Sequence, residues 1–415
     1  LVDLYDEVVA RWLVHHAIEL LHVRHIAWHS VTLTSLAKRL GLGLVFSLHD
    51  FYTVCPSVKL LDQELRYCGG TCTPGVGERD CAVELWPANG APPLKHRWVH
   101  AWRAKMERML RQADCLVTTS DGARDTLRDN FPGLADKPFH VIEHGRDFPR
   151  FEQLAGSLEE ASRIRILIPG NINDAKGAVL LAELAQLDTS QLFEFHVLGD
   201  IGASLHRARV VRHGKYARHE FAERVAAIRP HFGAIFSIWP ETYCHTLTEL
   251  WAAGVPVVAL DLGAVGERIR EHGGGWLLPL ASAEDVYGEL VRMARDVDGH
   301  IARVHEVSRW QRGHGRAHDT RAMARRYASI YANLLEPGRD SDVPCVAVVT
   351  PSGATASAPA SEHVRVRERI RPSAGRRVDY QPVHWSSILT TGAGRFDAAN
   401  GSTAGTLRYG QCDAC

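Results

Sequence analysis

Two glutamates, Glu241 and Glu249, stand where the local sequence pattern could build a ligand site. An apolar run ends at Pro240, which suits a buried strand whose chain must then turn, so Glu241 falls at the carboxyl end of that strand. Glu249 falls just inside the helix that follows. Ligands of open α/β sheets bind at such crevices, and free amides at a helix start favour a phosphate. The pattern therefore predicts a site for an anionic ligand, with two solvated surface charges as the alternative.

Capping residues and apolar periodicity predict the elements around these glutamates. Thr246 or Thr248 can cap the helix, which carries an apolar stripe and is closed by Gly254. The strand that follows, residues 255–260, is apolar without alternation, as expected of a parallel strand that is covered on both faces. These elements favour a parallel α/β sheet.

Lys176 and His49 add two further groups near strand ends. Lys176 follows an apolar strand that ends in Gly170, and its ammonium could neutralise a leaving phosphate as a point charge. His49 follows the strand 44–48, where an imidazole could accept a hydrogen bond from a hydroxyl or move a proton. An exposed loop lysine and a structural histidine are the alternatives.

The order of these motifs resembles that of the retaining glycosyltransferases of the GT-B fold, family 4, also called glycosyl transferases group 1. In that family a proline and a glutamate precede a glycine-aromatic-glycine turn, a second glutamate and the motif G-x-P-V-V. The corresponding positions here are occupied by Pro240, Glu241, Tyr243, Glu249 and the segment 254–258.

Other positions extend this resemblance or depart from it. The segment 49–56, HDFYTVCP, matches the His-Asp and Cys-Pro pattern that borders the acceptor side of the family's cleft. Thr242 and Cys244 replace the glycines of the turn, and Asn171 stands where the family commonly has an arginine. In the segment 139–147, FHVIEHGRD, a histidine replaces the asparagine of the family's N-G-x-D pattern.

The resemblance implies an α/β GT-B architecture, in which two Rossmann-like parallel-sheet domains face a cleft. Residues 1–150 would form the acceptor-side domain, and residues 151–335 the nucleotide-sugar-binding domain with its final helix. Residues 336–415 are rich in Ser, Ala, Pro and Arg and are expected to form a linker or low-complexity tail. The family's opening strand and glycine-rich turn are not found before Leu20. We therefore expect a segment of a longer polypeptide, or an incomplete gene product, whose first domain lacks its first N-terminal strand-helix unit.

The resemblance also implies an enzyme, a hexosyltransferase of polysaccharide biosynthesis. It would move a hexose from a nucleoside diphosphate sugar to a hydroxyl of a glycan or lipid-linked saccharide, with retained anomeric configuration. The catalytic residues would be His49 at the acceptor, Glu241 at the sugar and Lys176 at the diphosphate. The implied donor-binding residues are Gly170, Asn171, Lys176, Tyr243, Thr246, Leu247 and Glu249, the last of them on the ribose hydroxyls.

Two other functions fit parts of the sequence. A catalytically silent GT-B module, which binds nucleotide sugar or acts as a scaffold in a larger polypeptide, agrees with Asn171 and with the incomplete first domain. A sugar-nucleotide epimerase is a third alternative. Transfer of the sugar would support the transferase, binding without transfer would support the silent module, and epimerised donor would support the epimerase.

Four cysteines, Cys55, Cys68, Cys72 and Cys81, cluster in one long glycine-bearing segment. Four thiolates could hold a structural zinc ion in tetrahedral geometry, while free thiols and a disulfide are the alternatives. The resemblance implies no metal or cofactor for catalysis, and we interpret the Asp-Val-Asp sequence at residues 296–298 as solvated.

Composition excludes some classes of partner. Lys plus Arg equals Asp plus Glu at 48 each, so no basic field argues for nucleic acid. No apolar run approaches the roughly 20 residues that span a bilayer. The basic segment 92–112 carries Trp98, Trp102, Met106 and Met109 at helical spacing, which indicates a core stripe or, alternatively, peripheral membrane contact. We expect a cytoplasmic protein that works freely or at the inner face of the membrane.

Overall fold

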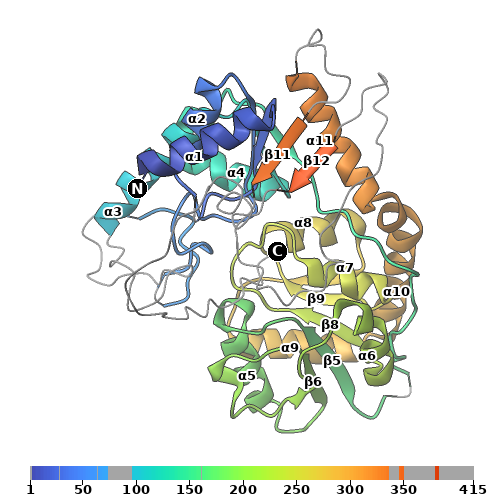
Figure 1. Cartoon of the computed structure of the whole chain (residues 1–415). Coiled ribbons are helices and arrows are strands. Elements are labelled where there is room, and N and C mark those ends of the chain that lie inside the picture. The colour runs from blue at the N-terminus through green and yellow to red at the C-terminus, as the bar shows by residue number, and fades with distance from the viewer. Residues whose placement is uncertain are drawn as a thin grey trace, which may run out of the picture.

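The computed structural model describes residues 2–27, 29–62, 64–72, 96–159, 161–335, 345–349 and 379–382 of the chain. Within these residues the chain forms two α/β domains, each built on a parallel sheet, and the two domains lie one beside the other (Figure 1). The predicted fold class is therefore confirmed.

The first sheet has the strand order β12-β11-β1-β2-β3-β4, and every neighbouring pair is parallel. Its strands are β1 Leu20–Val23, β2 Gly43–Ser47, β3 Cys115–Thr118, β4 Phe139–Val141, β11 Cys345–Val349 and β12 Asp379–Pro382. Its helices are α1 Val2–His15, α2 Leu33–Arg39, α3 His96–Leu110 and α4 Asp121–Asn130. These four helices share one core with the strand residues Leu21, Val23, Leu44 and Phe46.

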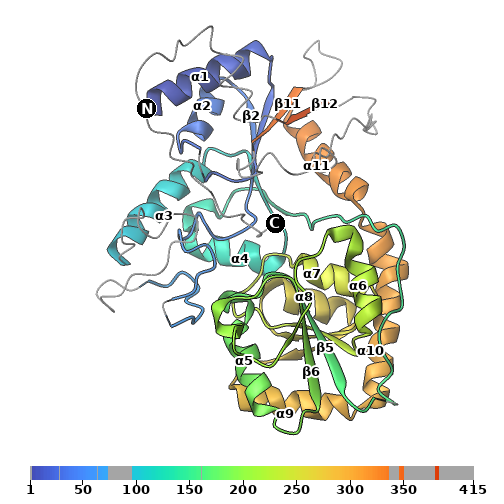
Figure 2. The same ribbon diagram turned by 60° about the horizontal axis from the view of Figure 1, so that its bottom comes forward.

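The second sheet has the order β10-β9-β8-β5-β6-β7, again entirely parallel. Its strands are β5 Ile164–Pro169, β6 Phe193–Leu198, β7 Val211–Arg212, β8 Phe232–Ile235, β9 Val257–Leu260 and β10 Gly275–Leu278. Its helices are α5 Ala178–Leu187, α6 Phe221–Ile228, α7 His245–Ala252, α8 Gly263–His272, α9 Ala283–Ala294 and α10 Val297–Trp310. Helices α5 and α9 cover one face, and α6, α7, α8 and α10 cover the other (Figure 2).

The last helix, α11 Thr320–Leu334, returns from the second domain to the first (Figure 1). Its residues Tyr327, Ile330 and Tyr331 pack on the face of the first sheet that α1 to α4 leave free. There the buried His22 bonds at Nδ1 to the Tyr331 hydroxyl, at 2.6 Å, and at Nε2 to the Ser47 hydroxyl, at 2.7 Å. The helix thereby fastens the two domains together.

Two short segments differ from the sequence expectation of a linker or tail after residue 336. Residues 345–349 and 379–382 form β11 and β12, next to β1 in the first sheet. The reason is tertiary, because a run of five apolar residues becomes a strand only where a partner strand is available, and β1 lies more than 300 residues away in sequence.

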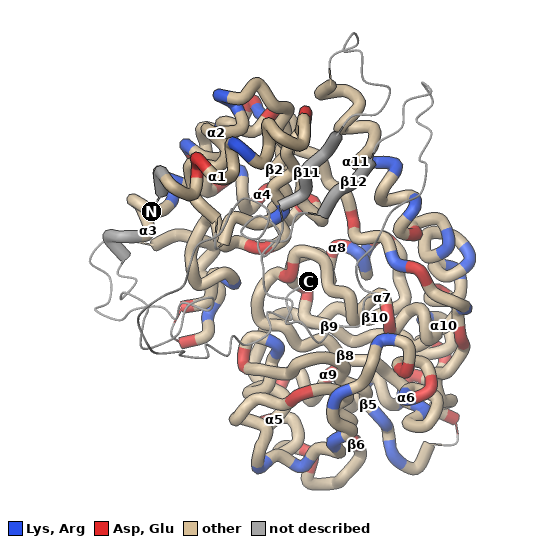
Figure 3. The backbone as a smooth tube through the Cα atoms, in the orientation of Figure 1, with Lys and Arg blue, Asp and Glu red and all other residues tan. Residues whose placement is uncertain are grey.

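Three of the four residues of the predicted stripe on α3, Trp102, Met106 and Met109, belong to the core, and the Trp98 side chain lies outside the described part of the structure. Met106 and Met109 are buried among the helices of the first domain, and the Trp102 indole donates to the Tyr52 carbonyl at 3.0 Å. No described helix has the length and apolar character that crossing a membrane requires. Acidic and basic residues are interspersed along both domains (Figure 3).

Replacing Tyr331 with phenylalanine should destabilise the protein. The change leaves a buried ring nitrogen of His22 without its partner, which costs about 1–3 kcal/mol. Thermal unfolding should show a lower melting temperature, whereas Tyr327→Phe, one turn away on the same helix, should change it little. Equal effects of the two variants would contradict this role of the hydroxyl.

Candidate functional site

The buried Glu241 forms an ion pair with the half-buried Lys176 at the carboxyl ends of the second sheet. The Lys176 ammonium donates to Glu241 Oε1 at 2.7 Å, and the Ser237 hydroxyl donates to the same oxygen. Burial alone would raise the pKa of Glu241, but the nearby ammonium and these hydrogen bonds hold it below its usual value. Burial alone would lower the pKa of Lys176, but the same carboxylate holds it above its usual value. Both side chains therefore carry their charges near neutral pH.

A glycine directs Lys176 toward this carboxylate. Residues 174–176 form one turn of 3₁₀ helix, capped by Asn173, whose side chain accepts from the Lys176 amide at 3.1 Å. Gly177 then takes a left-handed conformation with φ +81°, and a Cβ there would collide with the backbone of Phe236. Only glycine fits, so the lysine is locked between the turn and α5. Asn171, which was predicted to bind donor, is exposed at the start of this loop.

Helix α7 begins at His245, and the predicted cap by Thr246 or Thr248 is wrong. The cap is Cys244, which takes the left-handed conformation with φ +73° and makes no capping hydrogen bond through its side chain. Thr248 is unable to serve because its hydroxyl lies buried inside the helix and accepts from Arg268 at 2.8 Å. The α7 start thus presents its first amides without a side-chain cap, which suits an anion.

Arg268 on α8 shapes the turn before α7, and sequence reasoning missed it. Its guanidinium is buried and donates to the carbonyls of Tyr243 at 3.1 Å and Cys244 at 3.2 Å. It also lies 4.4 Å from the centre of the Tyr243 ring, within cation–π range. The resemblance offered no signal for this arginine, because it stands outside the quoted motifs.

Glu249 is held by a second arginine that sequence reasoning passed over. Arg146 donates to Glu249 Oε1 at 2.7 Å, and both side chains are buried. The Tyr216 hydroxyl lies 3.4 Å from the other oxygen, Oε2. Arg146 is the variable position of the His-Gly-Arg-Asp sequence, so a charged residue at the domain crossing was a signal within reach. A carboxylate offers about four acceptor sites, so Glu249 keeps the capacity to bind further hydroxyls.

His49 is neutral, and its Nε2 already accepts hydrogen bonds. Arg24 donates to Nε2 from two nitrogens, at 3.1 and 3.3 Å. Because a guanidinium can only donate, Nε2 accepts and the ring proton lies on Nδ1. Burial and then the Arg24 charge lower the pKa of His49 well below its usual value. Nδ1 is buried without a partner among the described residues, so His49 offers a hydrogen-bond donor rather than a base.

Three imidazoles join the domains in a stack. His144, in the crossing segment, stacks between His49 of the first domain and His245 of α7, with ring centres 5.2 and 5.0 Å apart. Burial and then the Arg24 charge lower the pKa of His144 to about 3, while burial and then His144 lower that of His245 to about 2. All three rings are therefore neutral near pH 7.

Direct hydrogen bonds also hold the turn 241–245 against the first domain. The Thr119 hydroxyl donates to the Thr242 carbonyl at 2.6 Å, and the Thr242 hydroxyl donates to the His49 carbonyl. Glu267 on α8 accepts from the Gly122 amide at 2.7 Å. The predicted site residues of both domains are thus brought together at one interface.

The remaining predicted donor residues lie around the same point. The Tyr243 hydroxyl donates to the His144 carbonyl at 2.7 Å. Gly170 has φ +112°, and a Cβ at this position would lie 3.5 Å from Thr246 Cγ2. The Leu247 side chain is fully buried in the core, so only its backbone can face a ligand. The structure therefore gathers the predicted residues, although it adds three arginines that were not foreseen.

The cysteine segment is only partly described. Cys55 and Cys68 are free thiols among the described residues, Cys72 accepts from Arg103 at Sγ, at 3.7 Å, and Cys81 lies outside the described residues. No group of three or more His, Cys, Asp or Glu within the described ranges is arranged to hold a metal ion. The predicted zinc site, with Cys81 as its fourth ligand, stays a prediction.

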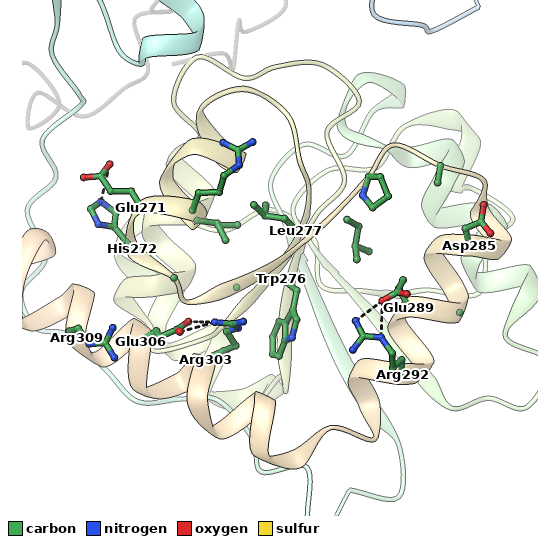
Figure 4. Close-up of a pocket in the computed structure, with 18 of the residues that line it drawn as sticks. Glu271, His272, Trp276, Leu277, Asp285, Glu289, Arg292, Arg303, Glu306 and Arg309 are labelled. Carbon is green, nitrogen blue, oxygen red and sulfur yellow. Dashed lines mark hydrogen bonds and ion pairs between the residues drawn. The ribbon is translucent and has the colours of Figure 1, made fainter.

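A groove of about 1020 Å³ lies at the open edge of the second sheet, away from these motifs. It runs along β10 between α8, α9 and α10 (Figure 4). Two of its arginines are already paired, Arg292 with Glu289 at 2.6 Å and Arg303 with Glu306 at 2.7 Å. Its size does not make it the functional site, because none of the ligand-binding motifs faces it.

Two parallel-sheet domains joined by a crossing segment and a returning helix define the GT-B class. The first of them, residues 4–150, matches the family model described as Glycosyltransferase Family 4, and residues 163–296 match the model Glycosyl transferases group 1. The chain is therefore a glycosyltransferase of the GT-B fold, in family 4, group 1.

Solved structures share this fold at low sequence identity. Anabaena HepE in complex with UDP is similar with a TM-score of 0.55 at 13% identity, over 79% of this chain and 82% of HepE. Sucrose-phosphate synthase from Thermosynechococcus elongatus has a TM-score of 0.53 at 15% identity, over 80% and 77% of the two chains. A glycosyltransferase from Rickettsia africae has 0.52 at 15%, over 80% and 81%. No curated protein sequence matches.

The left-handed backbone conformation of Cys244 predicts that a glycine variant at this position is more stable than an alanine variant. A residue with a Cβ costs about 1–2 kcal/mol in that conformation relative to glycine. Cys244→Ala removes the thiol and keeps the strain, whereas Cys244→Gly removes both. Denaturant unfolding should therefore show the glycine variant more stable than the alanine variant by about 1 kcal/mol. An alanine variant of equal or greater stability would contradict the strain.

The neutral histidine stack predicts loss of stability in mild acid. Groups whose pKa is lowered on folding stabilise the protein above their unfolded pKa of about 6.5, and that stability falls as the pH drops below it. Each histidine contributes up to about 1.4 kcal/mol per pH unit. Unfolding free energies measured between pH 7 and 5 should fall less steeply for His144→Asn than for the parent protein. Identical slopes would show that His144 does not titrate on unfolding.

Proposed function

We propose that this glycosyltransferase transfers a hexose from a nucleoside diphosphate sugar to an acceptor hydroxyl with retention of the anomeric configuration. One arrangement carries the proposal: Lys176, Glu241, Glu249 and the α7 start converge at the carboxyl ends of the second sheet. Crevices of this kind bind phosphate-bearing ligands in open α/β sheets. HepE, which shares the fold, has been solved with UDP and with UDP-glucose, so uridine donors come first for testing.

The diphosphate would lie over the α7 start beside Lys176. The uncapped amides and the ammonium stabilise negative charge that grows on the leaving oxygen, and such preorganised donors act most strongly in a buried site. Gly170 leaves room for close approach of the phosphates to the backbone. Asn171 can contribute only neutral hydrogen bonds there.

Glu249 would bind the ribose hydroxyls of the donor. Its Oε1 is anchored by Arg146, while Oε2 has only the long contact with Tyr216. The guanidinium keeps the carboxylate charged and fixes its direction, and a charged acceptor strengthens each hydrogen bond from a hydroxyl. Glu241 would face the sugar, where its charge stabilises the positive charge that develops at the anomeric carbon.

The acceptor proton would leave with the diphosphate. In the transfer, the bond between the anomeric carbon and the phosphate oxygen breaks, and the carbon bonds to the acceptor oxygen. Among the described residues the candidate bases are poor proton acceptors: the Lys176 ammonium holds the pKa of Glu241 below its usual value in spite of burial, and His49 Nε2 already accepts from Arg24. The departing phosphate oxygen is therefore the acceptor for that proton, while His49 Nδ1–H orients a sugar or acceptor hydroxyl.

The two glutamates should separate binding from turnover. Glu249→Gln should weaken nucleoside diphosphate binding about ten- to hundredfold, because a charge-assisted hydrogen bond contributes about 1.5–3 kcal/mol. Glu241→Gln should leave that affinity nearly unchanged and lower kcat. Calorimetry with UDP, GDP and ADP, followed by turnover assays with the sugar donor that binds, provides both readouts.

Glu284→Gln, an exposed carboxylate on α9, is the matched control and should change neither quantity. Thermal unfolding of each variant checks that it folds. Affinity without transfer or donor hydrolysis in the parent protein would instead support the catalytically silent module. No affinity for any nucleoside diphosphate sugar would contradict the proposal.

The finer assignments are carried by the family resemblance. They comprise an acceptor that is a glycan or lipid-linked saccharide, a role in polysaccharide biosynthesis, and a cytoplasmic location, either free or at the inner face of the membrane. Catalysis without a metal ion belongs with them, and a donor assay in the presence of a chelator tests it directly.

A further inference from the structure

Helix α8 of the second domain lies against helix α4 of the first domain (Figures 1 and 2). The half-buried Glu267 of α8 accepts from the Gly122 amide, in the first turn of α4, at 2.7 Å. The first amides of a helix have no partner within the helix, and its dipole favours a negative charge there. Glu267 therefore joins the two domains by a charge-assisted hydrogen bond.

The close approach of Glu267 accounts for the glycine at position 122. Gly122 lies within α4 and keeps a right-handed backbone, in which alanine would favour the helix more. A Cβ at this position would collide with Glu267 Oε1. The glycine is thus explained by the contact with the second domain and not by the backbone of its own helix. The start of α4 is shaped to receive this carboxylate.

Within little more than one turn, α8 connects this contact to the candidate site. The Ala264 amide donates to the Glu241 carbonyl at 2.9 Å, and a Cβ on Gly263 would meet the same oxygen at 2.7 Å. Arg268, which follows Glu267, holds the carbonyls of the turn before α7. Because the start of α8 packs this tightly on Glu241, the docking of Glu267 on α4 sets where Glu241 stands relative to the first domain.

The candidate site is closed in this arrangement. Glu241 and Glu249 are each only 6% exposed, so a sugar donor reaches them only after contacts between the domains have opened. The neighbouring contacts are hydrogen bonds of Thr119 and Thr242, which exchange for bonds to water at small net cost. The apolar packing of α11 on the first sheet is costlier to separate. The domains are therefore expected to stay joined at α11 and to open between α4 and α8.

We propose that Glu267 is a positioning residue for the transfer reaction: its docking on the start of α4 closes the two domains and brings Glu241 into place opposite His49. The inference rests on the proposed function, because it takes these two side chains as the groups at the sugar and at the acceptor. Glu267 itself is directed at α4. Its loss should slow transfer without weakening nucleotide binding, since Lys176 and Glu249 both belong to the second domain.

Substitutions of the carboxylate test this role by kinetics. Glu267→Ala should lower kcat at least about tenfold, because it removes a hydrogen bond of a charged group, and should leave the Kd of the nucleoside diphosphate within about twofold. Glu267→Gln keeps an oxygen that can accept from the Gly122 amide, and kcat should recover to within about threefold of the parent value. Glu271→Ala, an exposed position one turn later on α8, is the matched control and should change neither quantity. A glutamine variant as slow as the alanine variant would overturn the hydrogen-bond role.

Gly122→Ala tests the same contact from the first domain. The added Cβ should displace Glu267 and lower kcat as much as Glu267→Ala does, although alanine favours the helix. In one chain the two substitutions should slow transfer no more than either does alone, because both break a single contact. Effects that multiply would show that the two residues act independently and would overturn the proposal.

Hydrogen exchange of the Gly122 amide separates this proposal from the proposed function, since it needs no donor. Measured by NMR in the full chain, this amide should exchange about tenfold faster or more in Glu267→Ala than in the parent protein or in Glu271→Ala. Unchanged exchange would overturn the contact itself. Faster exchange with a parent-like kcat would overturn the positioning role alone. Absence of transfer in the parent protein would overturn the proposed function, and the positioning role with it.

Discussion

Charge compensation between buried side chains is the constraint on which the site depends. Glu241 and Glu249 are both buried where the two domains meet, and an uncompensated carboxylate there would cost several kcal/mol. Lys176 balances the first and Arg146 the second. Each cation comes from a different part of the chain, so the site forms only when the loop after β5, the domain crossing and α7 are all in place.

Arginine side chains make most of the contacts that hold the site residues in place. Arg24 holds His49 in one tautomer, Arg146 fixes Glu249, and Arg268 holds the carbonyls of the turn before α7. A guanidinium stays charged at any accessible pH and donates in several fixed directions, which explains its use at buried positions. Their combined positive field, with burial, also keeps the histidine stack neutral.

Local patterns in the sequence predicted the class of the fold and most of the elements around the site. The strand at 255–260 and the apolar stripe of α7 follow from apolar periodicity and glycine positions, whereas the strand that was expected to run up to Pro240 ends at Ile235. The cap of α7 was missed because a left-handed Cys244 is favoured by no propensity and is held by Arg268 from another helix. Arg24 and Arg268 stand outside every motif that the sequence offered, and β11 becomes recognisable only through its pairing with β1.

The central claim is that Glu249, anchored by Arg146, receives the ribose of a nucleoside diphosphate whose phosphates lie at the α7 start. A crystal structure of the full chain with the tightest-binding nucleoside diphosphate tests this most directly. The account predicts ribose hydroxyls on the Glu249 carboxylate and a phosphate within hydrogen-bond reach of Lys176 and the first amides of α7. A nucleotide bound elsewhere, such as in the groove along β10, with Glu249 in contact only with Arg146 and Tyr216, would contradict it.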